Sequence, residues 1–269
     1  MKRSSRARLG ATAAVCALSI ALITGCGGGS DDSDASESSN KPSSSPAKTA
    51  ETAKTLTSAE LKKLIVTKAD LEGYDVDSAD TGGRFAESKD EVTVADARCE
   101  PIAYVLTGFA PGEESAFVSR MASPAAQVIT SKPEAESTDP LEDALGATMT
   151  IVSLSSYEGD GAERTMRALG DAVAGCTGGF TASAKGQDTE KFTKVSTEKS
   201  AATSGESMAF AVTGATEGGG EPTVHAQVVR HGSTIATYYS INLAALGGGK
   251  QTKYSVPAAI VKAQAAKLA

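Results

Sequence analysis

The sequence predicts an α+β protein in which a twisted antiparallel sheet is flanked by helices, all within residues 56–269. Two observations support this prediction. The patterns run in the order helix, strands, helix, four strands, helix, which is typical of helices packed on an antiparallel sheet. The last third also alternates apolar with small or polar residues between glycine-rich turns. We expect a single domain with its helices on one side of the sheet.

The first helices are predicted from capping signals. Thr57 and Glu60 form a Thr-x-x-Glu capping box, with Leu56 and Leu61 at the flanking apolar positions. Residues 67–70 repeat the cap. Further on, the segment 99–101 (Cys-Glu-Pro) favours the start of another short helix, because proline is well tolerated in a first turn.

The middle and the last third supply the remaining elements. We predict strands at residues 114–121, 126–131 and 147–154, and then a helix from Asp160 to Gly175 that Asp160 and Glu163 cap. In that helix Glu163 and Arg167 are spaced for an ion pair one turn apart. Four strands at 192–195, 207–213, 223–230 and 234–241 and a last helix from about Val256 complete the pattern.

The first 25 residues have the pattern of a bacterial secretory leader. Four basic residues precede an apolar run from Leu9 to Ile23. A membrane-spanning helix is the competing interpretation, but a span needs about 20 apolar residues. This run is shorter and ends in Gly-Cys-Gly-Gly-Gly. We therefore expect residues 1–25 to be a cleaved signal peptide.

The end of this leader resembles the lipobox of bacterial lipoproteins. Ile23, Thr24, Gly25 and Cys26 match that pattern position by position. The resemblance implies that Cys26 carries acyl chains of the palmitate type, which attach the protein to the extracytoplasmic face of the cell membrane. Each buried methylene contributes ~0.8 kcal/mol, so two or more chains hold a protein stably.

Residues 26–55 contain almost nothing apolar, so we predict a disordered polar tether. Without the four cations of the leader, the chain is more acidic than the −7 of the full sequence. This negative net charge argues against nucleic acid as a partner and against binding of anionic lipid through a cluster of basic residues. The acyl chains on Cys26 then remain as the membrane contact.

The four cysteines are expected to have different roles. Cys16 leaves with the leader and Cys26 is the lipid site, so Cys99 and Cys176 remain in a compartment that permits oxidation. We predict that these two pair in a disulfide. The alternatives are two free buried thiols or a metal pair, but two sulfurs and the only two histidines make a poor zinc site.

Motifs for catalysis, metals or cofactors find no convincing match. The segment 247–251 imitates a phosphate-binding loop, but Ala244 stands where the first glycine is required and Gln251 replaces the Ser or Thr. Asp31, Asp32 and Asp34 imitate the start of a calcium loop without its glycine or closing glutamate. We expect no enzymatic activity, no metal and no cofactor.

One group of residues is a candidate for ligand binding. His225 and His231 share the polar parity of one predicted strand and its turn, and Arg230 and Tyr239 are close in the pattern. They could form a ligand-contacting or pH-sensitive patch. The alternative is that both histidines simply face solvent.

Several segments together resemble a known family of sensor domains. They are "Leu-Thr-Ser-Ala-Glu-Leu", "Asp-Leu-Glu-Gly-Tyr", "Cys-Glu-Pro-Ile", "Ala-Gly-Cys" and "Val-Val-Arg-His-Gly-Ser-Thr-Ile-Ala-Thr". The chain is similar to actinobacterial (Streptomyces-like) surface lipoproteins related to the extracytoplasmic sensor domain of mycobacterial PknH-type Ser/Thr kinases. The resemblance implies a twisted antiparallel sheet with flanking helices and a groove for a ligand. It departs in the cysteines, since that domain has two disulfides and only Cys99 and Cys176 could pair here.

Three functions remain open at this point. The first is a non-catalytic ligand-binding or sensor-like lipoprotein, whose small-molecule or lipid ligand is unknown. The second is a lipid carrier, which predicts a large apolar cavity between sheet and helices. The third is a wall-associated interaction protein with an unknown protein partner, which predicts an exposed apolar patch.

Overall fold

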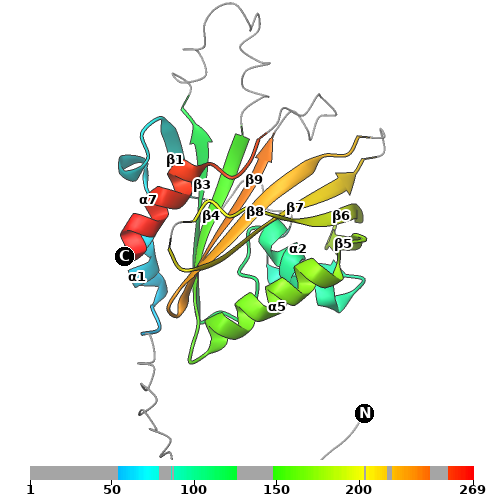
Figure 1. Cartoon of the computed structure of the whole chain (residues 1–269), viewed down its shortest axis with the longest axis horizontal. Coiled ribbons are helices and arrows are strands. Elements are labelled where there is room, and N and C mark those ends of the chain that lie inside the picture. Colours follow the sequence, from blue (N-terminus) through cyan, green and yellow to red (C-terminus); the bar gives the residue numbers. More distant parts are fainter. Residues whose placement is uncertain are drawn as a thin grey trace, which may run out of the picture. The chain divides into compact units, whose positions relative to one another are not determined.

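A computed structural model describes residues 54–78, 86, 88–125, 148–202, 204–216, 220–242 and 254–269. The described residues form a nine-stranded sheet in the order β1-β3-β4-β9-β8-β7-β6-β5-β2. Every neighbouring pair of these strands is antiparallel. Helices pack against the sheet (Figure 1), so the predicted α+β class is confirmed.

The sheet and its helices have the following bounds. The strands are β1 (Tyr74–Ser78), β2 (Val92–Val94), β3 (Ala116–Pro124), β4 (Thr148–Ser156), β5 (Phe180–Ala184), β6 (Glu190–Glu198), β7 (Glu206–Ala215), β8 (Thr223–His231) and β9 (Thr234–Asn242). The α-helices are α1 (Ser58–Leu64), α2 (Glu100–Leu106), α5 (Gly161–Gly175) and α7 (Ala258–Leu268). The 3-10 turns η1 (Lys68–Asp70), η2 (Lys89–Glu91) and η3 (Ala97–Cys99) lie between them.

Two apolar clusters lie on opposite faces of the sheet. On β9, Ile235 belongs to the cluster formed with α2 and α5, whereas its neighbour Ala236 belongs to the cluster formed with α1 and α7. On β8, Val228 and Val229 divide in the same way. Because successive residues of a strand point to opposite faces, α2 and α5 cover one face and α1 and α7 cover the other.

The expectation that helices cover only one side of the sheet is therefore wrong. Figure 1 shows α1 and α7 beside β1, β3 and β4, at the opposite end of the sheet from β5 and β6. The physical reason lies in the central strands. Eight of the nine residues of β9 and seven of the nine of β4 are buried, so both of their faces need a cover.

Several local predictions are confirmed. The Thr57–Glu60 capping box opens α1, and Leu61 is fully buried. Asp70 accepts hydrogen bonds from both the backbone N–H and the hydroxyl of Thr67. Pro101 lies in the first turn of α2. The helix predicted from Asp160 to Gly175 and the four strands of the last third are all present, with strands one to a few residues longer than predicted.

Other local predictions need correction. Asp160 does not cap α5 through its side chain, because its carboxylate pairs with Arg164 instead. Glu163 lies 3.5 Å from Arg230 of β8. This ion pair crosses the contact between α5 and the sheet, whereas the predicted pair lay within the helix. The strand predicted at 114–121 is β3 and extends through Pro124, while residues 126–131 lie outside the described residues.

Three strands were not predicted, namely β1, β2 and β5. β2 has three residues, and β1 and β5 have five each. In β1 and β5 most of the side chains are polar or small. Such short runs carry little apolar periodicity, so pairing with a longer neighbour determines them. Thr55, which was predicted as part of the tether, donates a hydrogen bond from its hydroxyl to the carbonyl of Tyr157. Residues 26–53 lie outside the described residues.

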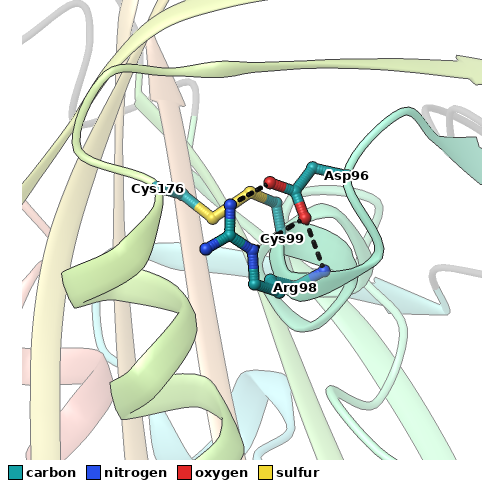
Figure 2. Close-up of a disulfide and its surroundings, with 4 residues drawn as sticks. All are labelled: Asp96, Arg98, Cys99 and Cys176. Atoms are coloured by element: carbon teal, nitrogen blue, oxygen red, sulfur yellow. Dashed lines mark hydrogen bonds and ion pairs between the residues drawn. A yellow bond between two sulfur atoms is a disulfide. The ribbon is translucent and has the colours of Figure 1, made fainter.

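The predicted disulfide joins Cys99 to Cys176, and their Cα atoms are 6.1 Å apart. It ties the end of α5 to the turn that precedes α2. Figure 2 shows Arg98 and Asp96 beside it, where the guanidinium Nη2 lies 2.6 Å from the Asp96 carboxylate. Both cysteines are almost fully buried, whereas the side chain of Arg98 is largely exposed. The disulfide is thus a core element with an exposed ion pair at its edge.

A buried glutamine joins α7 to the end of α1. The Oε1 atom of Gln264 accepts a hydrogen bond from the backbone N–H of Val66 at 2.9 Å. Its Nε2 donates to the carbonyl of Leu64 at 2.9 Å. Gln264 is fully buried, so these bonds are shielded from water. Among the described helices, none has the length and apolar character required to cross a membrane.

Candidate functional site

The four residues predicted as a ligand patch do not form one site. His225 and His231 are six residues apart on β8 and lie on the same face, about 20 Å apart at the usual rise of a strand. Arg230 and Tyr239 lie on the opposite face, because Arg230 is next to His231 and Tyr239 pairs with Ala226. The structure therefore does not bring these four residues together.

His225 and Arg230 are both held by glutamates. The Nδ1 atom of His225 lies 2.9 Å from Glu198 Oε2, and its ring contacts Tyr254 edge-on at 4.6 Å. The Nε atom of Arg230 donates to Glu206 at 2.7 Å. The His225 side chain is 14% exposed, so the alternative that both histidines simply face solvent does not describe it. Both residues have structural partners within the sheet.

Tyr239 and Tyr238 are on neighbouring positions of β9 and opposite faces of the sheet. Tyr239 packs against the cluster with α2 and α5, and burial raises the pKa of its hydroxyl. Tyr238 packs against the cluster with α1 and α7, and burial raises its pKa as well. Both hydroxyls therefore stay protonated at neutral pH.

Of the four predicted residues, His231 lines one of the two cavities described here, which we call the His231 pocket. It has a volume of about 310 Å³. One wall is apolar and is lined by Leu56, by Leu64 of α1, by Leu268 of α7 and by Ala269, which follows α7. All three leucines are partly buried and pack against the core between the sheet and these helices. The pocket therefore combines an apolar wall with the turn between β8 and β9.

The other wall of the His231 pocket is polar. It contains His231, Ser233 and Thr234 of the β8–β9 hairpin, with Lys54 and Lys267 at the rim. Ser233 is already engaged, because its hydroxyl donates to the carbonyl of Lys54 at 2.5 Å. Thr234 is almost fully buried. The lysines and the histidine are thus the polar side chains left to meet a ligand.

Hydrogen bonds to the strands fix the segment of residues 54–56 along one side of the pocket. The backbone N–H of Leu56 donates to Ser156 Oγ at the end of β4, at 2.7 Å. Thr55 and Lys54 bond to Tyr157 and Ser233, as described above. Leu56 also directly precedes the capping box of α1, the helix whose Leu64 lines the same pocket. The segment that would continue into the tether is therefore part of the pocket wall.

His231 is the residue with an unusual environment in this pocket. Its Nε2 atom is buried and has no hydrogen-bond partner among the residues that the structure describes. Burial lowers the pKa of the imidazole below its ordinary value, because the charged form loses hydration. The ring is therefore neutral at pH 7, and its Nε2 can serve a ligand either as donor or as acceptor.

Both lysines at the rim are paired with carboxylates. Lys54 Nζ lies 2.5 Å from Glu60, and Lys267 Nζ lies 2.9 Å from Asp70. The hydrogen bond from Lys54, together with those from Thr57, lowers the pKa of Glu60 to about 2. The hydrogen bond from Lys267 lowers the pKa of Asp70. Both carboxylates are thus ionised at neutral pH.

The capping glutamate gives a testable pH dependence. Because the pKa of Glu60 is about 2 in the folded state against 4.5 as the reference, its contribution is fully present above pH 4.5. It is lost as the pH falls through about 2. We expect Glu60→Gln to lower the melting temperature at pH 7 and to make the loss of stability between these pH values smaller. Thermal melts followed by circular dichroism measure both effects.

Glu72→Gln is the matched control for that experiment, because it removes one exposed carboxylate outside the capping box. The melting temperature of this control should fall with decreasing pH in the same way as that of the parent chain. An equal change in both variants would contradict a specific role of Glu60.

A second cavity of about 350 Å³ lies at the β5–β6 end of the sheet. Phe180 and Phe192 line it with ring centroids 4.7 Å apart, and Asp96 and Lys191 are at its edge. Gly179 has φ of +87°, and a side chain there would meet the carbonyl of Phe192. None of its lining atoms is a buried polar atom without a partner, which distinguishes it from the His231 pocket.

Neither cavity has metal ligands in a suitable group. Within the described part of the chain, no three His, Cys, Asp or Glu side chains come close enough to hold a metal ion. Sequence patterns singled out only His231 among the residues of its pocket. Lys54, Leu64 and Lys267 were not predicted as site residues, because they are far apart in the sequence. Each of them is also explained by its own helix or segment, without reference to a pocket.

Comparisons with known proteins give a likeness to a solved structure. No protein-family profile matches the chain, and no curated protein is similar to it at a significant level. Among solved structures, the chain is similar to the extracellular domain of PknH from Mycobacterium tuberculosis. The TM-score is 0.43 at 12% identity, over 80% of this chain and 95% of that one. At these values we draw no argument on function from the likeness.

Proposed function

We propose that this protein is a lipid-anchored extracytoplasmic module that binds a small ligand in the His231 pocket without catalysing a reaction. Cys26 carries the acyl chains, and the polar residues after it separate the head domain from the membrane. The head supplies a rigid sheet with a pocket at the side where the tether joins it. Function is assigned to this pocket because a fold alone does not specify one.

The observation that carries the binding proposal is the buried Nε2 of His231, which has no partner within the described residues. Buried polar atoms are rarely left unpaired, since each lost hydrogen bond costs about 1–3 kcal/mol. His231 is among the residues that line the adjoining cavity, so a ligand that reaches this atom from the cavity would supply the missing partner. The volume of about 310 Å³ is at the lower end of the range for small-molecule sites and is small for a two-chained lipid.

Anchoring is tested by Cys26→Ala in the full chain, expressed in an actinobacterial host. We expect the variant to lose metabolic labelling with palmitate and to escape normal leader cleavage. Cys16→Ala is the matched control, because that cysteine lies in the predicted leader, and it should be acylated normally. Full acylation of the Cys26 variant would refute the anchoring part of the proposal.

Ligand binding is tested by native mass spectrometry of the chain from Gly27 onward, exported from the same host with a non-lipoprotein leader. We expect a small-molecule adduct that His231→Phe removes. His225→Phe is the matched control, since that histidine is on the same face of β8 but outside the pocket. A clean mass for the parent chain would count against binding, and a two-chained lipid adduct would favour a carrier instead.

A further inference from the structure

We propose that the His231 pocket is built for a medium-chain monocarboxylate, whose head meets Lys267, Lys54 and His231 and whose chain lies along the leucines. This inference rests on the proposed function and specifies the chemical class of its ligand. It is argued from the polar wall, from the apolar wall and from the balance of charge around them.

The polar wall favours an oxygen acceptor. Each lysine ammonium has three N–H donors, and a carboxylate already faces Lys54 and Lys267. Donors therefore remain on both side chains, and the neutral ring of His231 can add a third at Nε2. A ligand oxygen that accepts from these groups gains charge-assisted hydrogen bonds. An ammonium group would bring only further N–H donors to a wall that already consists of donors.

The apolar wall requires a hydrocarbon portion in the ligand. Leu56, Leu64 and Leu268 come from three different segments and border the same cavity. Each buried methylene of a ligand contributes about 0.8 kcal/mol when it leaves water. The pocket has no Phe, Tyr or Trp in its lining for stacking, so an alkyl chain fits it better than a sugar or a nucleobase.

The charge balance limits the head group to a single negative charge. Glu60 and Asp70 offset Lys54 and Lys267, and the imidazole of His231 is neutral at pH 7. These side chains therefore carry no surplus of positive charge with which to hold a dianion such as a phosphate monoester. A monocarboxylate needs only the free N–H donors, which remain available beside the paired carboxylates.

The test compares three probes with the same chain and different heads: octanoate, octan-1-ol and octylamine. Their affinities for the chain from Gly27 onward are measured by titration calorimetry at neutral pH and low salt. A charge-assisted hydrogen bond contributes about 1.5–3 kcal/mol, which corresponds to roughly tenfold or more in affinity. We therefore expect octanoate to bind at least about tenfold more tightly than octanol and octylamine to bind more weakly than either.

Two variants separate the two walls of the pocket. Lys267→Met should abolish the preference for octanoate over octanol, while Leu268→Ser should weaken both probes by a similar factor. Lys262→Met is the matched control on the same helix, because Lys262 is exposed and does not line the pocket. An equal affinity for octanoate and octanol, or an unchanged preference in Lys267→Met, would overturn the proposal.

A second arm identifies the source of the acid, with oleate held in phosphatidylcholine vesicles as the probe. Transfer of oleate to the protein would indicate an acid taken from a membrane, and binding of octanoate alone would indicate a dissolved one. Both results support the carboxylate chemistry. If no probe binds but His231→Phe releases another small molecule from the host-purified chain, the ligand class is wrong and the proposed function stands. If neither occurs, both fail.

Discussion

Replacing Cys99 and Cys176 together by alanine is expected to lower the free energy of unfolding by about 2–5 kcal/mol. The disulfide closes a loop between residues 77 apart, so its loss increases the freedom of the unfolded chain. The substitution also removes two buried sulfur atoms from the folded state, because both lie in the core between α2, α5 and the sheet. Urea denaturation under identical buffer conditions measures the difference.

Arg98→Ala is the control for this substitution. Arg98 is next to Cys99 and forms an ion pair with Asp96, but its side chain is 75% exposed. Exposed ion pairs contribute about 0–1 kcal/mol, so this variant should unfold close to the parent chain. If the double cysteine variant were no less stable than Arg98→Ala, the disulfide would not be the structural element inferred here.

Replacing Gln264 by leucine is expected to lower the free energy of unfolding by about 2–4 kcal/mol. The leucine side chain has a similar size but cannot bond to the backbone of residues 64 and 66. The N–H of Val66 and the carbonyl of Leu64 would then lie beside a buried apolar side chain without this partner. Each such loss costs about 1–3 kcal/mol when water cannot replace the bond.

Thermal and urea unfolding measure this effect, and hydrogen exchange of the Val66 amide locates it. Lys262→Leu is the matched control, since it places a leucine on the exposed side of the same helix. We expect faster exchange at Val66 in Gln264→Leu only. Retained protection of that amide would show that Gln264 does not hold the two helices together.

The parts of the fold that local chemistry determines could be predicted from the sequence. The Thr57–Glu60 box and the apolar periodicity of residues 161–175 each act within a few residues, so they are visible in any short window. The disulfide followed from elimination, because only two cysteines remained after the leader and the lipid site were assigned.

The parts that depend on distant segments could not be predicted. Residues 92–94 are a strand because they pair with residues 182–184, and no local pattern contains that information. The second helical layer was missed for the same reason. The sequence of β9, Thr-Ile-Ala-Thr-Tyr-Tyr-Ser-Ile-Asn, mixes small polar and apolar residues, and burial of both of its faces is apparent only once α1 and α7 are placed.

The candidate site could be predicted only in part, because its residues come from segments that are far apart in the sequence. His231 was singled out for being one of two histidines, but its companions come from residues 54–64 and 267–268. No spacing rule connects segments about 200 residues apart. His225 looked equivalent in the sequence, and only its contact with Glu198 shows that its ring is already occupied.

The order of the strands has a consequence for how the chain is made. Thr148 of β4 pairs with Asn242 of β9, so the middle of the sheet joins segments that are synthesised far apart in time. Sheets dominated by such distant pairings fold slowly, since a long loop must close before its contacts form. In an emerging chain that still lacks residues 234–242, β4 and β8 have no strand between them to pair with. We expect the complete sheet to form only when this last pairing strand has been synthesised.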